Sequence, residues 1–140
     1  MIIWRSVDPT LLDPDFRRDV EAFLAASPYT WYVVSGFRPL EEQERLWRAH
    51  LAGGPKAAPP GRSAHNYGLA IDVVLDTDPD KPGLQPSWNT KLAGWGWLKA
   101  SSIPHPRLKN GWSFGDWPHI ERYRWRERIA EPKPPPTVRA

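Results

Sequence analysis

Two short stretches of the sequence contain residue types that bind metal ions, and they lie far apart along the chain. His65 and Asp72 belong to the segment 63–72, whereas His119 follows Asp116 much later. Imidazole nitrogens and carboxylate oxygens suit zinc, and a catalytic zinc keeps three protein ligands with a fourth position open for water. We therefore interpret His65, Asp72 and His119 as the three ligands of one zinc site.

The segment 68–75 is apolar and rich in β-forming residues apart from Asp72. It predicts a buried strand, with His65 in the loop that enters it. An unpaired carboxylate is costly to bury, so Asp72 should contact a metal, a cation or several hydrogen-bond donors. The alternative for a lone His or Asp is a satisfied polar residue at a strand edge, but the joint occurrence of the two stretches favours the metal.

These residues form a pattern that resembles a known family. The pattern S-x-H-x-x-G-x-A-x-D at 63–72, followed by D-x-x-H at 116–119, is similar to that of zinc peptidases. The family includes D-alanyl-D-alanine carboxypeptidases and dipeptidases, and the phage L-alanyl-D-glutamate endopeptidases. The upstream S-G-F-R at 35–38, with Gln43 just beyond, resembles a further block of the same family. The three blocks occur in the family's order and span residues 33–121.

The resemblance implies a role for each of three further residues. Asp116 would be the general base for a zinc-bound water, although local sequence alone favours a turn-forming Asp. Arg38 would bind substrate or stabilise the transition state, whereas residue type alone favours a salt bridge to Glu41 or Glu42. Ser63 would bind substrate or orient a ligand; a serine nucleophile is the competing idea, but no G-x-S-x-G motif is present.

The substrate implied by the resemblance is a peptide bond in the stem of peptidoglycan. Asp rather than Glu at 116, the small size and the absence of a signal peptide favour the phage endopeptidases and hence the L-alanyl-D-glutamate bond. The D-alanyl-D-alanine bond is the alternative. A non-catalytic, zinc-stabilised binding module also stays open, because hedgehog signalling domains share this fold. An endolysin of this kind would stay in the cytoplasm of the infected host until its release to the cell wall.

Length and composition place limits on these interpretations. The 140 residues contain no cysteine, which excludes thiolate zinc sites, and a net charge of +3 suits an anionic wall without indicating nucleic acid. We predict one catalytic domain at 1–130, acting as a monomer, and a disordered Pro-rich tail at 131–140. The basic and aromatic residues at 121–128 could contact an anionic outer membrane, or form a solvated strand or helix.

The elements that must position these residues predict an α+β fold, a small and mostly antiparallel sheet with flanking helices. Asp13 should cap a first helix and Pro39 should open a second, both packed on one face of the sheet. A strand at 30–35 should present Arg38 at its end. Ser87 should cap a third helix. The resemblance implies that an aromatic strand at 111–115 precedes the last ligand strand at 116–122.

Overall fold

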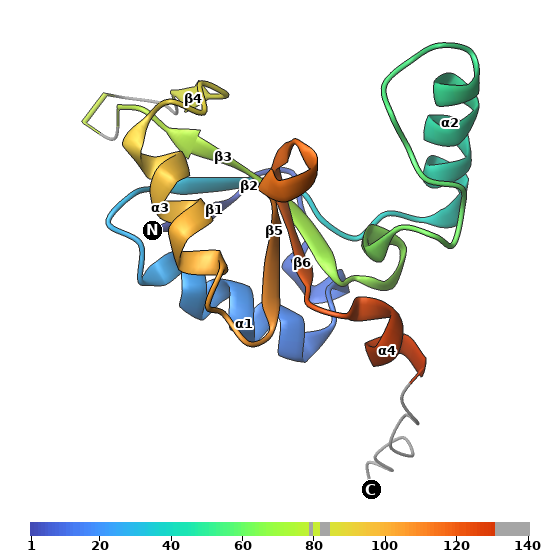
Figure 1. Cartoon of the computed structure of the whole chain (residues 1–140), viewed down its shortest axis with the longest axis horizontal. Helices are drawn as coiled ribbons and strands as arrows, with labels where there is room; N and C mark the ends of the chain where they lie inside the picture. Colours follow the sequence, from blue (N-terminus) through green and yellow to red (C-terminus); the bar gives the residue numbers. More distant parts are fainter. Residues whose placement is uncertain (79, 82–84, 131–140) are drawn as a thin grey trace, which may run out of the picture.

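The computed structural model describes residues 1–78, 80–81 and 85–130, so the predicted tail at 131–140 lies outside the described residues. Figure 1 shows the chain from its N-terminus in blue to its C-terminus in red. The elements in chain order are β1 (Ile2–Trp4), the 3-10 turn η1 (Pro9–Leu11), α1 (Pro14–Ala25), β2 (Trp31–Ser35), α2 (Leu40–Leu51), the 3-10 turn η2 (Ala64–Tyr67), β3 (Ala70–Asp76), β4 (Pro86–Ser87), α3 (Ala93–Ser102), β5 (Leu108–Gly111), the 3-10 turn η3 (Trp112–Phe114), β6 (Asp116–Arg122) and α4 (Trp125–Ala130).

The strands form one sheet in the order β1-β2-β3-β6-β5, and the short β4 pairs with β3. The pairing of β1 with β2 is parallel, and the other pairings are antiparallel. This arrangement confirms the predicted α+β class with a mostly antiparallel sheet. It also places β3, the strand that follows His65, in the middle between β2 and β6.

The first helix forms as its sequence predicts. The carboxylate of Asp13 accepts hydrogen bonds from the backbone N–H groups of Asp15 (3.1 Å) and Phe16 (3.0 Å), which satisfies donors at the helix N-terminus. The apolar stripe of α1 is buried in the core together with side chains of β2, β3 and α3. The core includes Phe16, Val20, Phe23, Leu24, Trp31, Ile71, Val73 and Trp95.

The second helix is not where the sequence predicts it. Figure 1 shows α2 standing apart from the sheet and not beside α1. Its residues Leu40 and Leu51 are exposed, and Gln43 is the buried residue of the helix. The backbone N–H of Arg38 donates to the carbonyl of His65 (2.9 Å), so the chain leaving β2 runs along η2 before α2 begins. The prediction that both helices cover one face is therefore wrong for α2.

The region around α3 also differs from its prediction. Ser87 lies in β4, where its hydroxyl accepts from the N–H of Asn89 (3.1 Å), and the helix begins later, at Ala93. A Cβ at Gly94 would lie 2.5 Å from a methyl carbon of Leu75, so glycine at this position lets α3 pack closely on β3. None of the helices in the described part of the chain is long and apolar enough to cross a membrane.

The aromatic segment before the last strand forms a turn and not the predicted strand. Trp112–Phe114 is the 3-10 turn η3, and it ends at Gly115, whose φ of 80° is left-handed. A Cβ at Gly111 would lie 2.3 Å from the carbonyl oxygen of Asp116, so the chain folds back on itself tightly here. This turn brings Phe114 against the ring of His119, with 6.1 Å between ring centroids.

The basic C-terminal segment contains α4. The guanidinium of Arg128 pairs with the carboxylates of Asp13 (3.2 Å) and Asp15 (3.5 Å), which ties α4 to the start of α1. Arg126 lies over the ring of Trp125, whose side chain is buried. Part of the arginine-rich segment therefore stabilises the fold, and the prediction of a membrane contact can concern only its exposed residues.

Candidate metal centre

The register of the sheet brings two of the proposed ligands together. Asp72 in β3 lies directly opposite His119 in β6, and directly opposite residues of an antiparallel pair point to the same face. The neighbours of Asp72, Ile71 and Val73, point to the other face, where they join the core. His65 comes from η2, immediately before β3. The site therefore lies on the sheet face opposite the core.

The donor atoms are spaced as a small cation requires. His65 Nε2 lies 3.4 Å from Asp72 Oδ2, and His119 Nδ1 lies 3.5 Å from Asp72 Oδ1. All three ligand atoms lie within 4.8 Å of one another. Zinc bonds of roughly 2.0–2.1 Å in a tetrahedron would separate neighbouring ligand atoms by about 3.3 Å. The distances involving Asp72 match this edge, so the three residues fit a zinc ion.

Each imidazole is oriented by a hydrogen bond on its far nitrogen. His65 Nδ1 donates to the backbone carbonyl of Gly36 (2.9 Å), which leaves Nε2 to face Asp72. His119 Nε2 donates to the carboxylate of Glu121 (2.7 Å), which leaves Nδ1 to face Asp72. Such partners fix the tautomer and make the facing nitrogen a better ligand. The buried rings are thus held with one nitrogen each toward a common point.

Sequence reasoning did not identify either of these partners. Glu121 could have been found, because it follows His119 by two residues in a strand and so lies on the same face. Gly36 could not have been found from the sequence, because its carbonyl reaches His65 only through the path that the chain takes after β2.

The electrostatics of the centre favour a positive charge. Burial lowers the pKa of His119, but hydrogen bonds to Asp72 and Glu121 outweigh that effect and raise it to about 9. Burial raises the pKa of Asp72, yet the hydrogen bonds with His119 and His65 hold it well below its usual range. The buried carboxylate is therefore ionised and requires a cation, which a metal ion would supply in place of a proton.

All six residues predicted for the site line one cavity of about 420 Å³. They are Arg38, Ser63, His65, Asp72, Asp116 and His119. Pro55, Lys56, Ala57 and Ala58 from the loop after α2 also line it, as does Trp88, which is 57% exposed. Trp88 was not identified from the sequence. The only sequence feature that could have identified Trp88 is the occurrence of a tryptophan in a polar stretch.

Asp116 begins β6 and contributes its carboxyl to this cavity. Asp116 is exposed at the cavity, and the partial burial of its carboxyl raises its pKa. The negative charge of Asp72 raises this pKa further, against the lowering effects of His119, His65 and Arg38. A carboxylate with a raised pKa is a better proton acceptor than a free aspartate. This environment suits a general base.

Arg38 is fixed by neutral groups and not by the predicted alternative, a salt bridge to Glu41 or Glu42. Its guanidinium donates to the side-chain oxygen of Gln43 (3.0 Å) and to the hydroxyl of Ser35 (3.4 Å). Glu42 pairs instead with Arg45, and no carboxylate among the described residues pairs with Arg38. The positive charge therefore remains available to an anionic group in the cavity.

Gln43 is the centre of the network that holds Arg38. It is 1% exposed, it donates to the carbonyl of Ala58 (2.7 Å), and it lies 3.4 Å from the side-chain nitrogen of Asn66. Asn66 in turn donates to the carbonyl of Arg38 (3.0 Å). One buried amide thus links α2, the loop after it and η2.

Ser63 caps the turn that carries His65. Its hydroxyl accepts from the backbone N–H of His65 (3.3 Å), and the side-chain oxygen of Asn66 accepts from the backbone N–H of Ser63 (3.4 Å). The turn ends at Gly68, with φ of 67°, where a Cβ would lie 2.9 Å from backbone atoms of Leu11 and Asp13. Ser63 therefore positions His65, and its predicted contact with substrate stays a prediction.

The family model VanY, described as D-alanyl-D-alanine carboxypeptidase, matches residues 11–104, a range that contains His65 and Asp72. The fold is similar to that of the Serratia marcescens L-Ala D-Glu endopeptidase ChiX, with 20% identity, a TM-score of 0.60, and coverage of 90% of this chain and 93% of that one.

Two further solved structures have the same fold. The LD-carboxypeptidase LdcB matches with 18% identity and a TM-score of 0.59, over 89% of this chain and 66% of that one. The D,D-pentapeptidase VanY from a VanB-type resistance cassette, solved as an E175A mutant in complex with Zn(II), matches with 18% identity and a TM-score of 0.52. That match covers 79% of this chain and 72% of the other. With most of its length matched by the family model, and with this fold, the chain belongs to the VanY family of peptidoglycan-acting peptidases.

Proposed function

We propose that the protein is a zinc-dependent endopeptidase that hydrolyses the L-alanyl-D-glutamate bond of peptidoglycan stem peptides. One observation carries the proposal: Asp72 lies 3.4 Å and 3.5 Å from ring nitrogens of His65 and His119, at the edge of a cavity that Asp116 also lines. The centre combines a place for a cation, a candidate base and room for a peptide.

His65, Asp72 and His119 would hold the metal. When bound, zinc lowers the pKa of a coordinated water toward about 7 and polarises a carbonyl, which removes the need for a protein nucleophile. The carboxylate of Asp116 would accept a proton from the attacking water and return it to the leaving amine. The raised pKa of Asp116 supports this role, because the carboxyl must hold the proton between the two transfers.

Arg38 would bind the negative charge of the substrate. Its guanidinium is fixed by Gln43 and Ser35 but has N–H groups left, and it lines the same cavity as the metal ligands. A fixed cation can anchor a substrate carboxylate or stabilise the oxyanion that develops on the carbonyl. In the first role, it would contact the α-carboxylate of the D-glutamate residue.

The choice of bond rests on Asp116 and on the similarity to ChiX, which is an L-Ala D-Glu endopeptidase. D-alanyl-D-alanine hydrolysis is the second candidate, because the matching family model carries that description. We also propose that the protein acts as a phage endolysin, which waits in the host cytoplasm as a monomer until it reaches the wall.

The test is digestion of purified peptidoglycan, with and without a chelator and with zinc added back. New N-terminal D-glutamate that depends on zinc is the expected product, identified by mass spectrometry. Free D-alanine would identify a carboxypeptidase instead. No release from folded, zinc-loaded protein would refute the peptidase proposal and favour a binding module.

The variant Asp116→Asn tests the base. It should lower kcat by about 10²- to 10⁴-fold, the usual contribution of general-base catalysis, while zinc stays bound. Asp80→Asn, at an exposed position, is the matched control and should leave kcat unchanged. Wild-type turnover by Asp116→Asn would show that another group accepts the proton.

A further inference from the structure

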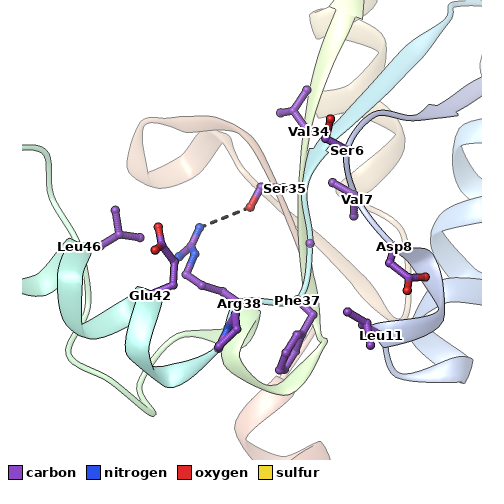
Figure 2. Close-up of a pocket in the computed structure, with 12 residues that line it drawn as sticks. Ser6, Val7, Asp8, Leu11, Val34, Ser35, Phe37, Arg38, Glu42 and Leu46 are labelled. Carbon is purple, nitrogen blue, oxygen red and sulfur yellow. Dashed lines mark hydrogen bonds between the residues drawn. The ribbon is translucent and has the colours of Figure 1, made fainter.

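A second cavity, of about 650 Å³, adjoins the candidate metal centre, and nothing described above assigns it a role. Figure 2 shows residues that line it, with the segment after β1 on one side and α2 on the other. The end of β2 lies between these two walls. The cavity is lined by Ser6, Val7, Asp8, Leu11, Val34, Ser35, Gly36, Phe37, Arg38, Pro39, Glu42 and Leu46.

The two cavities are contiguous around Arg38. Val34, Ser35, Arg38 and Leu46 line both the second cavity and the cavity of the metal centre. Figure 2 shows the guanidinium of Arg38 directed to Ser35, and both of these residues line both cavities. A peptide whose carboxylate binds Arg38 would therefore have its next residue at the mouth of the second cavity.

The walls of the second cavity combine apolar surface with negative charge. Val34 is 39% exposed, Phe37 38% and Leu11 55%, so apolar side chains face the solvent here. Asp8 lies on the wall formed after β1 and Glu42 on the wall formed by α2. Apart from Arg38, which already serves the proposed site, the charged residues that line this cavity are acids. Such a surface is complementary to an alkyl chain that ends in an amine.

Both acids are held in place and are ionised. The hydroxyl and backbone N–H of Thr10 donate to Asp8 (2.6 Å and 2.9 Å) and hold its pKa below the usual value. The hydrogen bond from Arg45 lowers the pKa of Glu42. Arg45 also neutralises part of the charge of Glu42, so Asp8 is the stronger site for a cation.

We infer that this cavity is a subsite for the residue that follows D-glutamate in the stem peptide, and that it selects a residue with a side-chain amine. The inference rests on the proposed function, which places the D-glutamate carboxylate at Arg38. The alkyl part of a diamino acid would contact Leu11 and Phe37, and its ammonium group would approach Asp8, while Glu42 on the opposite wall adds to the negative charge of the cavity. The subsite thus makes the charge of the third stem residue a determinant of specificity.

The test measures binding and not cleavage, so that its outcome is independent of the proposed reaction. Titration calorimetry with zinc-loaded full-length protein would compare γ-D-glutamyl-L-lysine with its Nε-acetyl counterpart, which keeps the alkyl chain and lacks the charge. The free amine should bind about fivefold more tightly, at the upper end of what a partly exposed charge pair contributes.

The double variant Asp8→Asn, Glu42→Gln should abolish this preference. Asparagine caps a helix as well as aspartate does, so the substitution at position 8 removes charge and keeps the cap. Glu44→Gln is the matched control, because Glu44 pairs with Arg48 on α2 and does not line the cavity. It should keep the wild-type preference.

Two results would overturn the inference. One is equal affinity of the wild-type protein for the two peptides, and the other is a preference that survives in the double variant. Failure of the proposed function would be seen in a different experiment, the digestion of purified peptidoglycan, which would then release no N-terminal D-glutamate.

Discussion

Glu121 gives the sharpest test of how the fold would adjust the affinity of the proposed metal centre. Its carboxylate accepts a 2.7 Å hydrogen bond from Nε2 of His119, and the side chains are only 17% and 11% exposed. We predict that Glu121→Gln weakens zinc binding without removing a ligand. Glutamine keeps an acceptor oxygen of similar reach, so the substitution removes the charge and little else.

The size of the effect follows from the loss of charge in one hydrogen bond. A hydrogen bond to a charged group contributes about 1.5–3 kcal/mol, and a neutral one about 0.5–1.5 kcal/mol. The difference, about 1–1.5 kcal/mol, corresponds to roughly a tenfold increase in Kd for zinc. Loss of a partner behind a metal-binding histidine costs about 10- to 100-fold, so this value lies at the lower end.

The assay is a competition titration for zinc against a chelating dye of known affinity, at one pH and ionic strength. Circular dichroism would check that the variant is folded. Glu127→Gln, at a position whose side chain is 71% exposed, is the matched control and should bind zinc as the wild type does. A Kd for Glu121→Gln within twofold of the wild type, in folded protein, would refute the role assigned to Glu121.

Three further predictions concern residues around the site and on the surface. Gln43→Leu should lower kcat/KM by at least tenfold while zinc affinity stays unchanged, because Arg38 loses its 3.0 Å acceptor; steady-state kinetics and zinc titration check this. Burial and Arg107 lower the pKa of His105, so its neutral form stabilises the fold above pH 6.5 and this stabilisation is lost as the pH falls through the folded pKa. His105→Ala should therefore destabilise the protein more at pH 8 than at pH 5 in thermal unfolding, and an equal loss at both would contradict the assignment. Changing Arg124 and Arg126 to Gln should reduce killing of intact cells but not hydrolysis of purified wall; unchanged killing would remove the proposed membrane contact.

Residue type and strand pattern were enough to predict that His65, Asp72 and His119 lie together. Asp72 stands alone as an acid in an apolar run, and the structure places it opposite His119, as a metal centre requires. The first helix was predictable because Asp13, Pro14 and a regular apolar stripe lie within one short segment. These features depend on residues that are close together along the chain, so they can be predicted without knowledge of the fold.

The features that the sequence did not predict depend on long-range packing. The second helix was predicted to pack on the sheet, but Leu40 and Leu51 are exposed because the chain after β2 follows η2 and leads α2 away from the sheet. The third helix begins after Ser87 because that residue pairs with Leu75 in the sheet. Gln43 was identified only through a resemblance, since its role depends on partners in three separate segments.

The pairing of β3 with β6 also affects the order in which the protein can become functional. The N-terminal part of the chain contains the proposed ligands His65 and Asp72, and the third proposed ligand, His119, joins them only when β6 pairs with β3. Such a distant contact forms slowly, because the entropy cost of closing a long loop comes before the favourable contacts between the strands can form. A nascent or truncated chain that lacks β6 would therefore hold zinc weakly, with two ligands. Zinc should bind tightly only at the end of folding, and it should stabilise the completed sheet. The metal content of a preparation would therefore measure the fraction of molecules that are completely folded.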